Sequence, residues 1–349
     1  MNRSATFELT LTRFIRAPRE KVYDAFVTEA GMKAWMCPRG MTLPEMKLDA
    51  RVGGGFRLVM RAKDGDQFTA QAQYRELARP ERLVYTWQWV GEGMPNVETL
   101  ITVTLAARDG GTEVRMTHSG FPDEALCESH KEGWGSCLNR LTDKLDPDGT
   151  AASVSLQGDP RSTYTRTARI GLAEKGIKYR MQQCGPHTPE ILAVHPWGRI
   201  PVFCDGDVRL FETSAILRYV EEAFPGPTLL PQNIRDRAVA EQWVSAINSY
   251  FYDLAVRRYV LQYVLKKEDR GVLEAAAKEL PAVLGHFERG YTRPFLAGQN
   301  ATLPDYFLAP IVGYLDMFPE SKAALAGCPR LMRAHAAMTA RASWKETQP

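Results

Sequence analysis

A polar, turn-rich segment at residues 146–152 constrains the fold most, because the sequence pattern differs on its two sides. The segment contains aspartate, proline, glycine and threonine, which are typical of turns between elements. Up to about residue 145 the chain reads as strands, short helices and one long terminal helix, whereas the pattern beyond the segment is mainly helical. A chain of 349 residues also exceeds one typical hydrophobic core. We therefore expect two or three domains, with a boundary near residue 148.

The composition excludes several classes of protein. With 44% hydrophobic and 24% charged residues, a folded globular chain is expected. No apolar run approaches the roughly 18 residues that a membrane helix needs, and a net charge of +3 with interspersed signs does not favour nucleic acid. The first residues lead into a strand pattern without the apolar core of a secretory signal. The six cysteines show neither Cys-x-x-Cys pairs nor metal-ligand spacing, so we expect reduced, mostly buried thiols, no metal and a cytoplasmic location.

The first 145 residues read as an antiparallel sheet that grips a long helix. Residues 7–13 alternate with a period of two, as a half-buried strand does, and a helix is expected at residues 19–28, where Pro18 suits the first turn. Trp134, Leu138 and Leu141 share one face of a helix near residues 128–145. Further strands are expected at residues 55–60, 69–76, 82–90, 99–106 and 112–119.

This region resembles the START-like (SRPBCC, helix-grip) superfamily, and within it homologues of the activator of the ninety-kilodalton heat-shock-protein ATPase. The resemblance spans about 145 residues and depends on residues 15–18 through 26, 52–56, 79–83 and 133–134. It implies an α+β helix-grip fold, in which members commonly enclose an apolar cavity. Simple core packing is the alternative reading of the aromatic residues, and we expect His118 and His130 to be packing or surface residues. The cavity would be lined by Trp35, Tyr74, Tyr85, Trp87, Met116 and Trp134.

The second region begins with the pattern of a strand, a turn and a helix. Residues 152–157 read as a short strand, and a helix is expected from about Thr163 to Lys175, with Gly176 as its stop. Ser162 lies at the mouth of this helix. A hydroxyl there could donate a hydrogen bond to a bound sulfur, while the positive end of the helix favours an anion. Both effects would lower the pKa of a thiol from its usual value of about 8.5 and so increase the reactive thiolate.

Residues 162–166 resemble the serine-type activating motif of the cytosolic glutathione transferase superfamily. The preceding strand has no tyrosine and position 162 is not cysteine, so the tyrosine and cysteine types fit less well. Tyr164, with Thr163 and Thr165, is a second candidate for the donor, and Ser162 could instead be an N-cap without a catalytic role. The resemblance implies glutathione as the co-substrate and a thioredoxin-like subdomain.

Two further segments complete the resemblance. In the family the bond before the proline at the position of Pro201 is cis, which directs the backbone of Ile200 toward the cysteinyl unit of glutathione. Arg199 or His187 would meet the glycyl carboxylate, and position 195 holds histidine where the family usually has asparagine. At the start of the next helix, Thr213 and the helix amides would hold the γ-glutamyl carboxylate, with Glu212 on its ammonium. The segment matches the Glu-Ser-x-Ala-Ile motif, with Thr213 in the serine position.

The rest of the chain, after a proline-rich linker at residues 225–231, is expected to be helical. Thr302 and Asp305 form the pattern of a capping box, which we assign to folding rather than to the site. A long amphipathic helix is expected here, and most of its apolar stripe would be core. The aromatic face of the stripe could close a hydrophobic substrate pocket. The stripe consists of Trp243, Ile247, Tyr250, Phe251, Leu254 and Val260.

The sequence therefore predicts three parts: a START-like domain at residues 1–147, a thioredoxin-like glutathione-binding subdomain at 148–230, and an all-helical subdomain at 231–349. We expect a serine-type glutathione S-transferase that attacks a small hydrophobic electrophile, with an apolar ligand as a possible partner of the first domain. The resemblance also implies a homodimer. The alternative is a non-catalytic ligand-binding or chaperone-associated adaptor that uses the transferase fold for dimerisation.

Overall fold

The computed structural model describes residues 6–95, 97–108, 110–146, 152–265 and 269–349. Contacts within the chain divide it into two compact units. The first runs up to Ser155 and includes the short segments Lys178–Arg180 and Cys204–Val208, and the second contains the remainder. The expected boundary near residue 148 lies outside the described residues, so the division at 147, 148, 230 and 231 stays a prediction.

The first unit is built on a seven-stranded antiparallel sheet of order β1-β7-β6-β5-β4-β3-β2. Every strand that the sequence predicted is present, within a few residues of the expected bounds. The strands are β1 (Phe7–Ile15), β2 (Thr42–Leu48), β3 (Gly55–Arg61), β4 (Gln67–Ala78), β5 (Arg82–Val90), β6 (Thr99–Arg108) and β7 (Gly111–Phe121).

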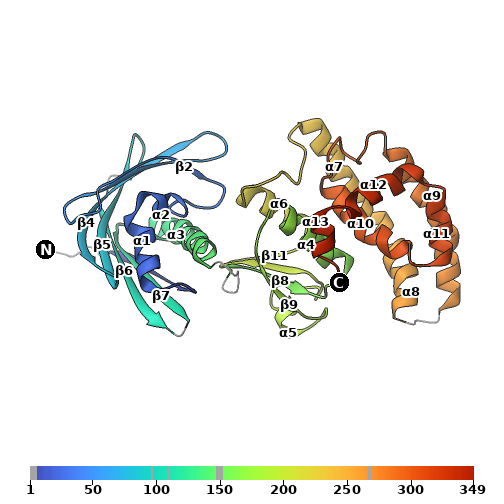
Figure 1. Cartoon of the computed structure of the whole chain (residues 1–349), viewed down its shortest axis with the longest axis horizontal. Helices are drawn as coiled ribbons and strands as arrows, with labels where there is room; N and C mark the ends of the chain where they lie inside the picture. Colours follow the sequence, from blue (N-terminus) through green and yellow to red (C-terminus); the bar gives the residue numbers. More distant parts are fainter. Residues whose placement is uncertain (1–5, 96, 109, 147–151, 266–268) are drawn as a thin grey trace. The chain divides into compact units, whose positions relative to one another are not determined.

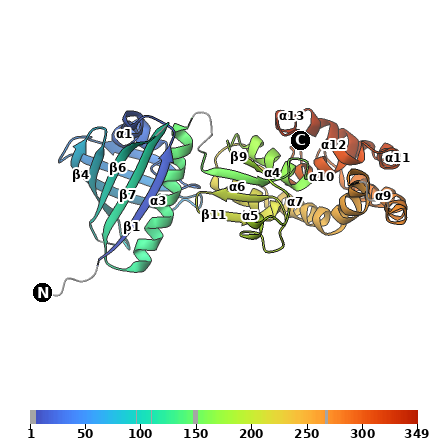
Figure 2. The ribbon, with the colours of Figure 1, turned by 90° about the horizontal axis from the view of Figure 1, so that it is seen from below.

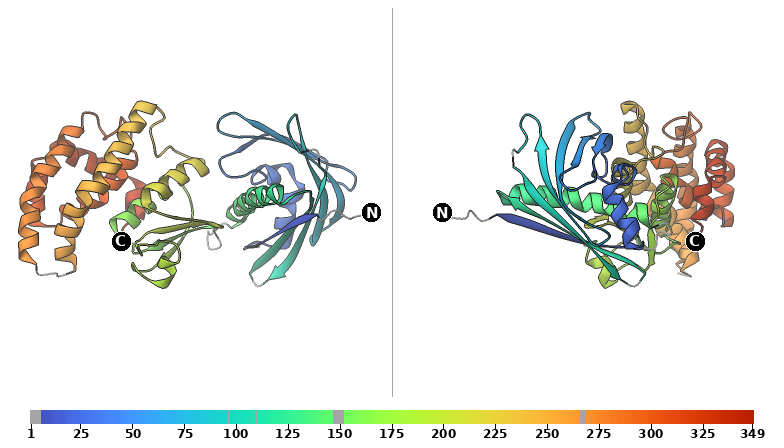
Figure 3. Two further views of the ribbon diagram at one scale, coloured as in Figure 1. Left: turned by 180° about the vertical axis from the view of Figure 1, so that it is seen from behind. Right: turned by 60° about the vertical axis from the view of Figure 1, so that its left-hand side comes forward.

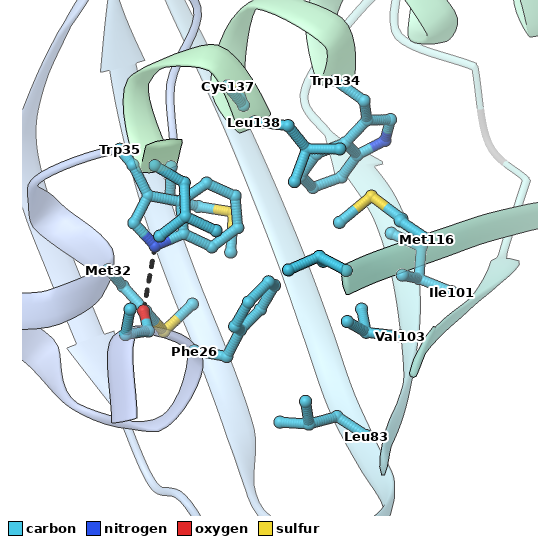
Figure 4. Close-up of a cluster of buried hydrophobic side chains, with 14 of the residues drawn as sticks. Phe26, Met32, Trp35, Leu83, Ile101, Val103, Met116, Trp134, Cys137 and Leu138 are labelled. Atoms are coloured by element: carbon cyan, nitrogen blue, oxygen red, sulfur yellow. Dashed lines mark hydrogen bonds between the residues drawn. The ribbon is translucent and has the colours of Figure 1, made fainter. Parts of the chain in front are cut away.

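Three helices, α1 (Arg19–Val27), α2 (Glu29–Lys33) and α3 (Glu124–Leu145), lie on the inner side of this curved sheet (Figure 1). Helix α3 begins four residues earlier than predicted because Asp123 caps it, its side chain accepting from the Leu126 amide at 2.8 Å. It runs alongside β1 (Figure 2). Buried side chains from helices and strands meet between the two layers, where the Trp35 indole donates to the Ala25 carbonyl at 2.9 Å (Figure 4). The expected helix-grip fold is confirmed.

A second sheet has four strands in the order β11-β10-β8-β9, and most of its residues belong to the second unit. Gly176 has a φ of 68° directly after α4, where the Ile177 amide donates back to the Leu172 carbonyl, so the predicted stop is confirmed. Helices α4 and α6 pack against each other, with Gly171 facing Leu217. The elements are β8 (Val154–Gly158), α4 (Thr163–Glu174), β9 (Arg180–Gln183), α5 (Pro189–Leu192), β10 (Val202–Asp205), β11 (Val208–Phe211) and α6 (Thr213–Ala223).

The remaining elements are helical, and the predicted long helix is interrupted in an unexpected way. Between α7 and α8 the backbone forms two π-helical segments, η1 (Ile247–Phe251) and η2 (Asp253–Val260). Helix α9 lies beside η2 (Figure 3). The capping box of α10 forms as predicted, with the Thr302 amide donating to Asp305 at 3.0 Å. The other bounds are α7 (Ile234–Ala246), α8 (Leu261–Val264), α9 (Arg270–Gly290), α10 (Leu303–Leu315), α11 (Pro319–Ala326), α12 (Pro329–Thr339) and α13 (Ala342–Glu346).

One residue of the predicted apolar stripe is misplaced. Tyr250 is 77% exposed, whereas Ile247, Phe251, Leu254 and Val260 are buried. The π-helical turns change the angular spacing of the side chains, so a stripe drawn with 3.6 residues per turn drifts off the buried face.

Two features of the structure concern the expectations drawn from composition. Among the described residues, no helix combines the length and the apolar character needed to cross a membrane. All six cysteines are free thiols; Cys184 is half-buried and the other five are buried.

Candidate functional site

The turn between β8 and α4 places Ser162 at the start of the helix. The Ser162 amide donates to the Asp159 carbonyl at 2.9 Å, which closes the turn. A Cβ atom at Gly158 would lie 2.6 Å from the Thr165 hydroxyl oxygen, so a glycine allows the strand to approach the helix. Ser162 is the N-cap, and its side-chain oxygen accepts from the Thr165 amide at 3.4 Å. Because the oxygen accepts, the hydroxyl proton remains available for a ligand.

The neighbouring hydroxyls are less available than that of Ser162. Thr163 is 4% exposed and Thr165 is fully buried, whereas Ser162 is half-buried. The Tyr164 hydroxyl donates to the Asn248 side-chain oxygen at 3.0 Å. The predicted runner-up donors are thus buried or already bonded, while Ser162 is half-buried.

Tyr164 forms an aromatic contact with the helical subdomain that the sequence did not reveal. Its ring stacks on Tyr252 with centroids 4.3 Å apart, and the Arg257 guanidinium lies 5.6 Å from the centre of the Tyr252 ring. Burial raises the pKa of both phenols, so both stay protonated at neutral pH. Asn248 and Tyr252 lie on the π-helical stretch or beside it, a type of distortion often found at functional sites.

The loop between α5 and β10 carries the second predicted segment. The Ile200–Pro201 peptide bond is cis, as the resemblance implied. His187 has a φ of 62° and its amide donates to the Gly198 carbonyl at 2.7 Å. Gly198 has a φ of 64°, and a Cβ atom there would collide with the His187 ring, so glycine is required. Arg199 and His187 are both exposed beside this loop.

The third predicted segment joins β11 to α6. Glu212 adopts a φ of 67° and a ψ of 113°, a backbone conformation that non-glycine residues rarely take and that often occurs at functional sites. Its side chain is 63% exposed. Thr213 is buried, and its hydroxyl donates to the Tyr164 carbonyl at 3.5 Å, which ties the start of α6 to the start of α4.

His195, which the sequence singled out only as a departure from asparagine, lies next to Glu212. Its Nε2 atom is 3.8 Å from Glu212 Oε1, and its ring lies on Phe211 with centroids 4.5 Å apart. Burial lowers the pKa of His195, outweighing the opposite effect of Glu212, so the imidazole is neutral at pH 7. Sequence reasoning missed this neighbour because 17 positions separate it from Glu212.

Together, these segments bring a hydroxyl donor, two helix N-termini, a carboxylate and exposed cationic side chains into one subdomain. Such a set suits a ligand that carries a sulfur, carboxylates and an ammonium. Within the described ranges, no group of three or more His, Cys, Asp or Glu side chains is arranged to hold a metal ion. The chemistry that the site's side chains support is hydrogen bonding and positioning.

The first unit contains an apolar cavity of about 260 Å³ between α3 and the sheet. Trp87 and Trp134 line it as predicted, together with Phe68, Trp89, Met60 and His130. The other four predicted lining residues are packed in the core instead: Trp35, Tyr74, Tyr85 and Met116.

The two histidines of this unit are packing residues, as expected. His118 accepts from the Trp134 indole at 3.0 Å, and His130 accepts from the Trp89 indole at 2.9 Å. Burial is the main cause that lowers the pKa of each ring, so both are neutral at pH 7. They thus hold the cavity wall in place through neutral hydrogen bonds.

Three family models match the chain in succession. Residues 16–146 match the family described as "Activator of Hsp90 ATPase homolog 1-like protein". Residues 156–228 match "Glutathione S-transferase, N-terminal domain", and residues 247–342 match "Glutathione S-transferase, C-terminal domain". The order of the two resemblances inferred from the sequence is confirmed.

Individual proteins match the second part of the chain. Glutathione S-transferase F10 of Arabidopsis thaliana is 30% identical over 201 residues, which cover 54% of this chain and 93% of that protein. Glutathione S-transferase F6 of the same plant is 31% identical, over 49% of this chain and 88% of the relative. Among solved structures, glutathione transferase F2 from Populus trichocarpa is 27% identical with a TM-score of 0.50, over 56% of this chain and 96% of that one.

Proposed function

This chain belongs to the glutathione S-transferase family, and we propose that it uses Ser162 to activate glutathione as a thiolate that attacks a small hydrophobic electrophile. One observation carries the assignment of Ser162. At the mouth of α4, Ser162 is half-buried, whereas Thr163 and Thr165 are buried and the hydroxyl of Tyr164, which is also half-buried, is bonded to Asn248.

To catalyse this reaction, the protein needs mainly to activate the glutathione thiol as a thiolate and to position its sulfur against the electrophile. The thiol of glutathione loses its proton to water, and the Ser162 hydroxyl donates a hydrogen bond to the resulting sulfur anion. The positive end of α4 stabilises the same charge. The sulfur lone pair then forms a bond to the electrophilic carbon as the leaving group departs with its electron pair.

The remaining predicted contacts hold the tripeptide in place. The Glu212 carboxylate receives the γ-glutamyl ammonium, while Thr213 and the first amides of α6 receive the γ-glutamyl carboxylate. Ile200 bonds the cysteinyl unit through its backbone, before the cis bond to Pro201. Arg199 or His187, both exposed beside this loop, meets the glycyl carboxylate.

Replacing Ser162 by alanine tests the central step. The Ser162→Ala variant should raise the pKa of bound glutathione by about one to two units and lower kcat/KM by about ten- to a hundredfold, because a hydrogen bond to a charged group contributes about 1.5–3 kcal/mol. The ultraviolet absorbance of the thiolate in a pH titration measures the pKa. Turnover of a generic aryl halide measures kcat/KM.

Two variants separate chemistry from folding, because Ser162 is also an N-cap. Ser162→Thr keeps a capping hydroxyl and should retain most of the activity. The Asn233 side chain caps α7 by accepting from the backbone amides of Arg235 and Asp236. Asn233→Ala removes this cap and should cost about 1 kcal/mol of stability without changing the thiol pKa. An unchanged thiol pKa in Ser162→Ala would show that Ser162 is not the activator.

The proposal includes a detoxifying role, a homodimer, a cytoplasmic location and an apolar ligand in the cavity of the first unit. The free, mostly buried cysteines support a reducing compartment. Light scattering of the purified chain tests the dimer. Family membership favours the enzyme over the adaptor reading, and turnover together with retention on immobilised glutathione discriminates between them.

A further inference from the structure

His195 is held in one orientation by contacts on two sides. The side chain is 3% exposed, and its Nδ1 atom accepts from the Trp197 amide at 3.3 Å. A neutral imidazole that accepts at Nδ1 carries its proton at Nε2. The Nε2–H group is therefore the one nearest Glu212, at 3.8 Å from Oε1, which is an electrostatic contact longer than a hydrogen bond.

Glu212 needs such support more than an ordinary surface carboxylate does. Its side chain is 63% exposed, and its backbone adopts the rare left-handed conformation described above. An exposed glutamate otherwise loses rotamer freedom when it binds a ligand, and this loss weakens binding. A fixed donor beneath the carboxylate would reduce that loss.

We propose that His195 is a positioning residue, whose Nε2–H group orients the Glu212 carboxylate toward the α-ammonium of the γ-glutamyl unit. This inference rests on the proposed function, because it takes glutathione as the ligand. It adds a role to a position that the sequence marked only as unusual. The imidazole touches neither the sulfur nor the electrophile, so the effect should fall on glutathione affinity rather than on the chemical step.

The neutral state of His195 suits this role. A positively charged imidazolium would compete with the ligand ammonium for the Glu212 carboxylate and would repel that ammonium. The charged groups that act on His195 are Glu212, which favours protonation, and Arg199, which opposes it; burial acts in the same direction as Arg199 and outweighs Glu212. The same loop therefore keeps His195 buried and neutral beside the carboxylate.

Two substitutions at position 195 separate its two contacts. The His195→Asn variant places an amide oxygen near the Nδ1 position and can still accept from the Trp197 amide, but it does not reach Glu212. The His195→Gln variant places an amide N–H near the Nε2 position and can still present it to Glu212. Titration calorimetry of the full chain with glutathione should show binding about tenfold weaker for the asparagine variant and nearly unchanged for the glutamine variant.

A ligand that lacks the ammonium distinguishes positioning from general loosening of the loop. Glutaryl-cysteinylglycine is glutathione without its α-amino group. It should bind wild type and His195→Asn equally, because neither the Glu212 carboxylate nor its orientation matters to this ligand. In a Glu212→Gln background, His195→Asn should have no further effect on glutathione binding, since the two changes interrupt one interaction.

Each result supports or overturns a definite statement. If wild type does not bind glutathione, the proposed function itself fails. If wild type binds, but His195→Asn weakens glutathione and glutaryl-cysteinylglycine by the same factor, or weakens neither, then His195 does not act through Glu212. An unchanged kcat with a raised KM for glutathione in His195→Asn is expected, and a fall in kcat alone would contradict the inference.

Discussion

Tyr164 lies two positions after Ser162, and a substitution there tests which of the two side chains activates the thiol. Its hydroxyl donates to Asn248, and its ring stacks on Tyr252. Tyr164→Phe should therefore leave the pKa of bound glutathione unchanged. It should lower the free energy of unfolding by about 1 kcal/mol, because the half-buried amide of Asn248 loses its partner. The absorbance titration and denaturant unfolding measure the two quantities.

Asn248→Ala provides the matched control, because it removes the same hydrogen bond from the other side. Both variants should share the loss of stability, and the double variant should lose little more than either alone. A rise of one unit or more in the thiol pKa of Tyr164→Phe would transfer the activating role from Ser162 to Tyr164.

The contrast between these residues shows what a sequence can reveal about a site. Ser162 lies at the start of α4, and Glu212 and Thr213 lie at the start of α6. The start of a helix has a local signature in the sequence. The contact of Tyr164 with Asn248 joins positions 84 apart, and that of His195 with Glu212 depends on how a loop packs against β11. Contacts of this second kind follow from tertiary packing, so no pattern of neighbouring residues predicts them.

Helix α10 depends on a buried carboxylate, and this dependence predicts a pH effect. Asp305 is 1% exposed and accepts from the amides of Leu296 and Thr302 at 3.1 and 3.0 Å. Burial is the main cause that raises its pKa to about 6. The folded state therefore binds a proton at a higher pH than the unfolded chain does, so the contribution of Asp305 to stability should increase as the pH falls from about 6 to about 4.

Comparison with Asp305→Asn isolates this group, because asparagine does not titrate. The stability of wild type minus that of the variant should grow by up to about 2 kcal/mol between pH 7 and pH 4, as measured by denaturant unfolding. Asp64→Asn makes the same substitution at an exposed position away from α10 and serves as the control for the general effect of pH on unfolding. A difference for Asp305→Asn that is flat or shrinks with falling pH would show that the carboxyl is ionised in the folded protein throughout this range.

The sequence pattern predicts some strands and helices more accurately than others. The alternating strands β5 to β7 and the segment from β11 to Ala223 were predicted closely, because periodicity and helix starts agree there. Strand β2 was missed, since Pro44 lies within it; its position at the sheet edge is where a strand tolerates proline. The π-helical turns of η1 and η2 carry no comparable local signature, so the exposure of Tyr250 could not be foreseen.

The molecule joins two units, each with its own candidate ligand site, and a substitution inside the first tests whether they act independently. Gly133 lines the cavity of about 260 Å³, and a Cβ atom there would meet no atom closer than Pro38 at 4.0 Å. Gly133→Leu should therefore fill part of the cavity without a clash and should stabilise α3 by up to about 1 kcal/mol, because leucine favours helix more than glycine does.

Three tryptophans line that cavity, Trp87, Trp89 and Trp134, so an apolar probe bound there should change their fluorescence in the full chain. We expect Gly133→Leu to abolish this change and to leave kcat/KM with glutathione and an aryl halide within about twofold of wild type, as independent sites do. Glu132→Leu, at the exposed neighbouring position of α3, adds the same side chain outside the cavity and should alter neither quantity. A fall in kcat/KM that is specific to Gly133→Leu would mean that the first unit delivers substrate to the second, because the substitution changes the cavity and none of the residues proposed to bind glutathione.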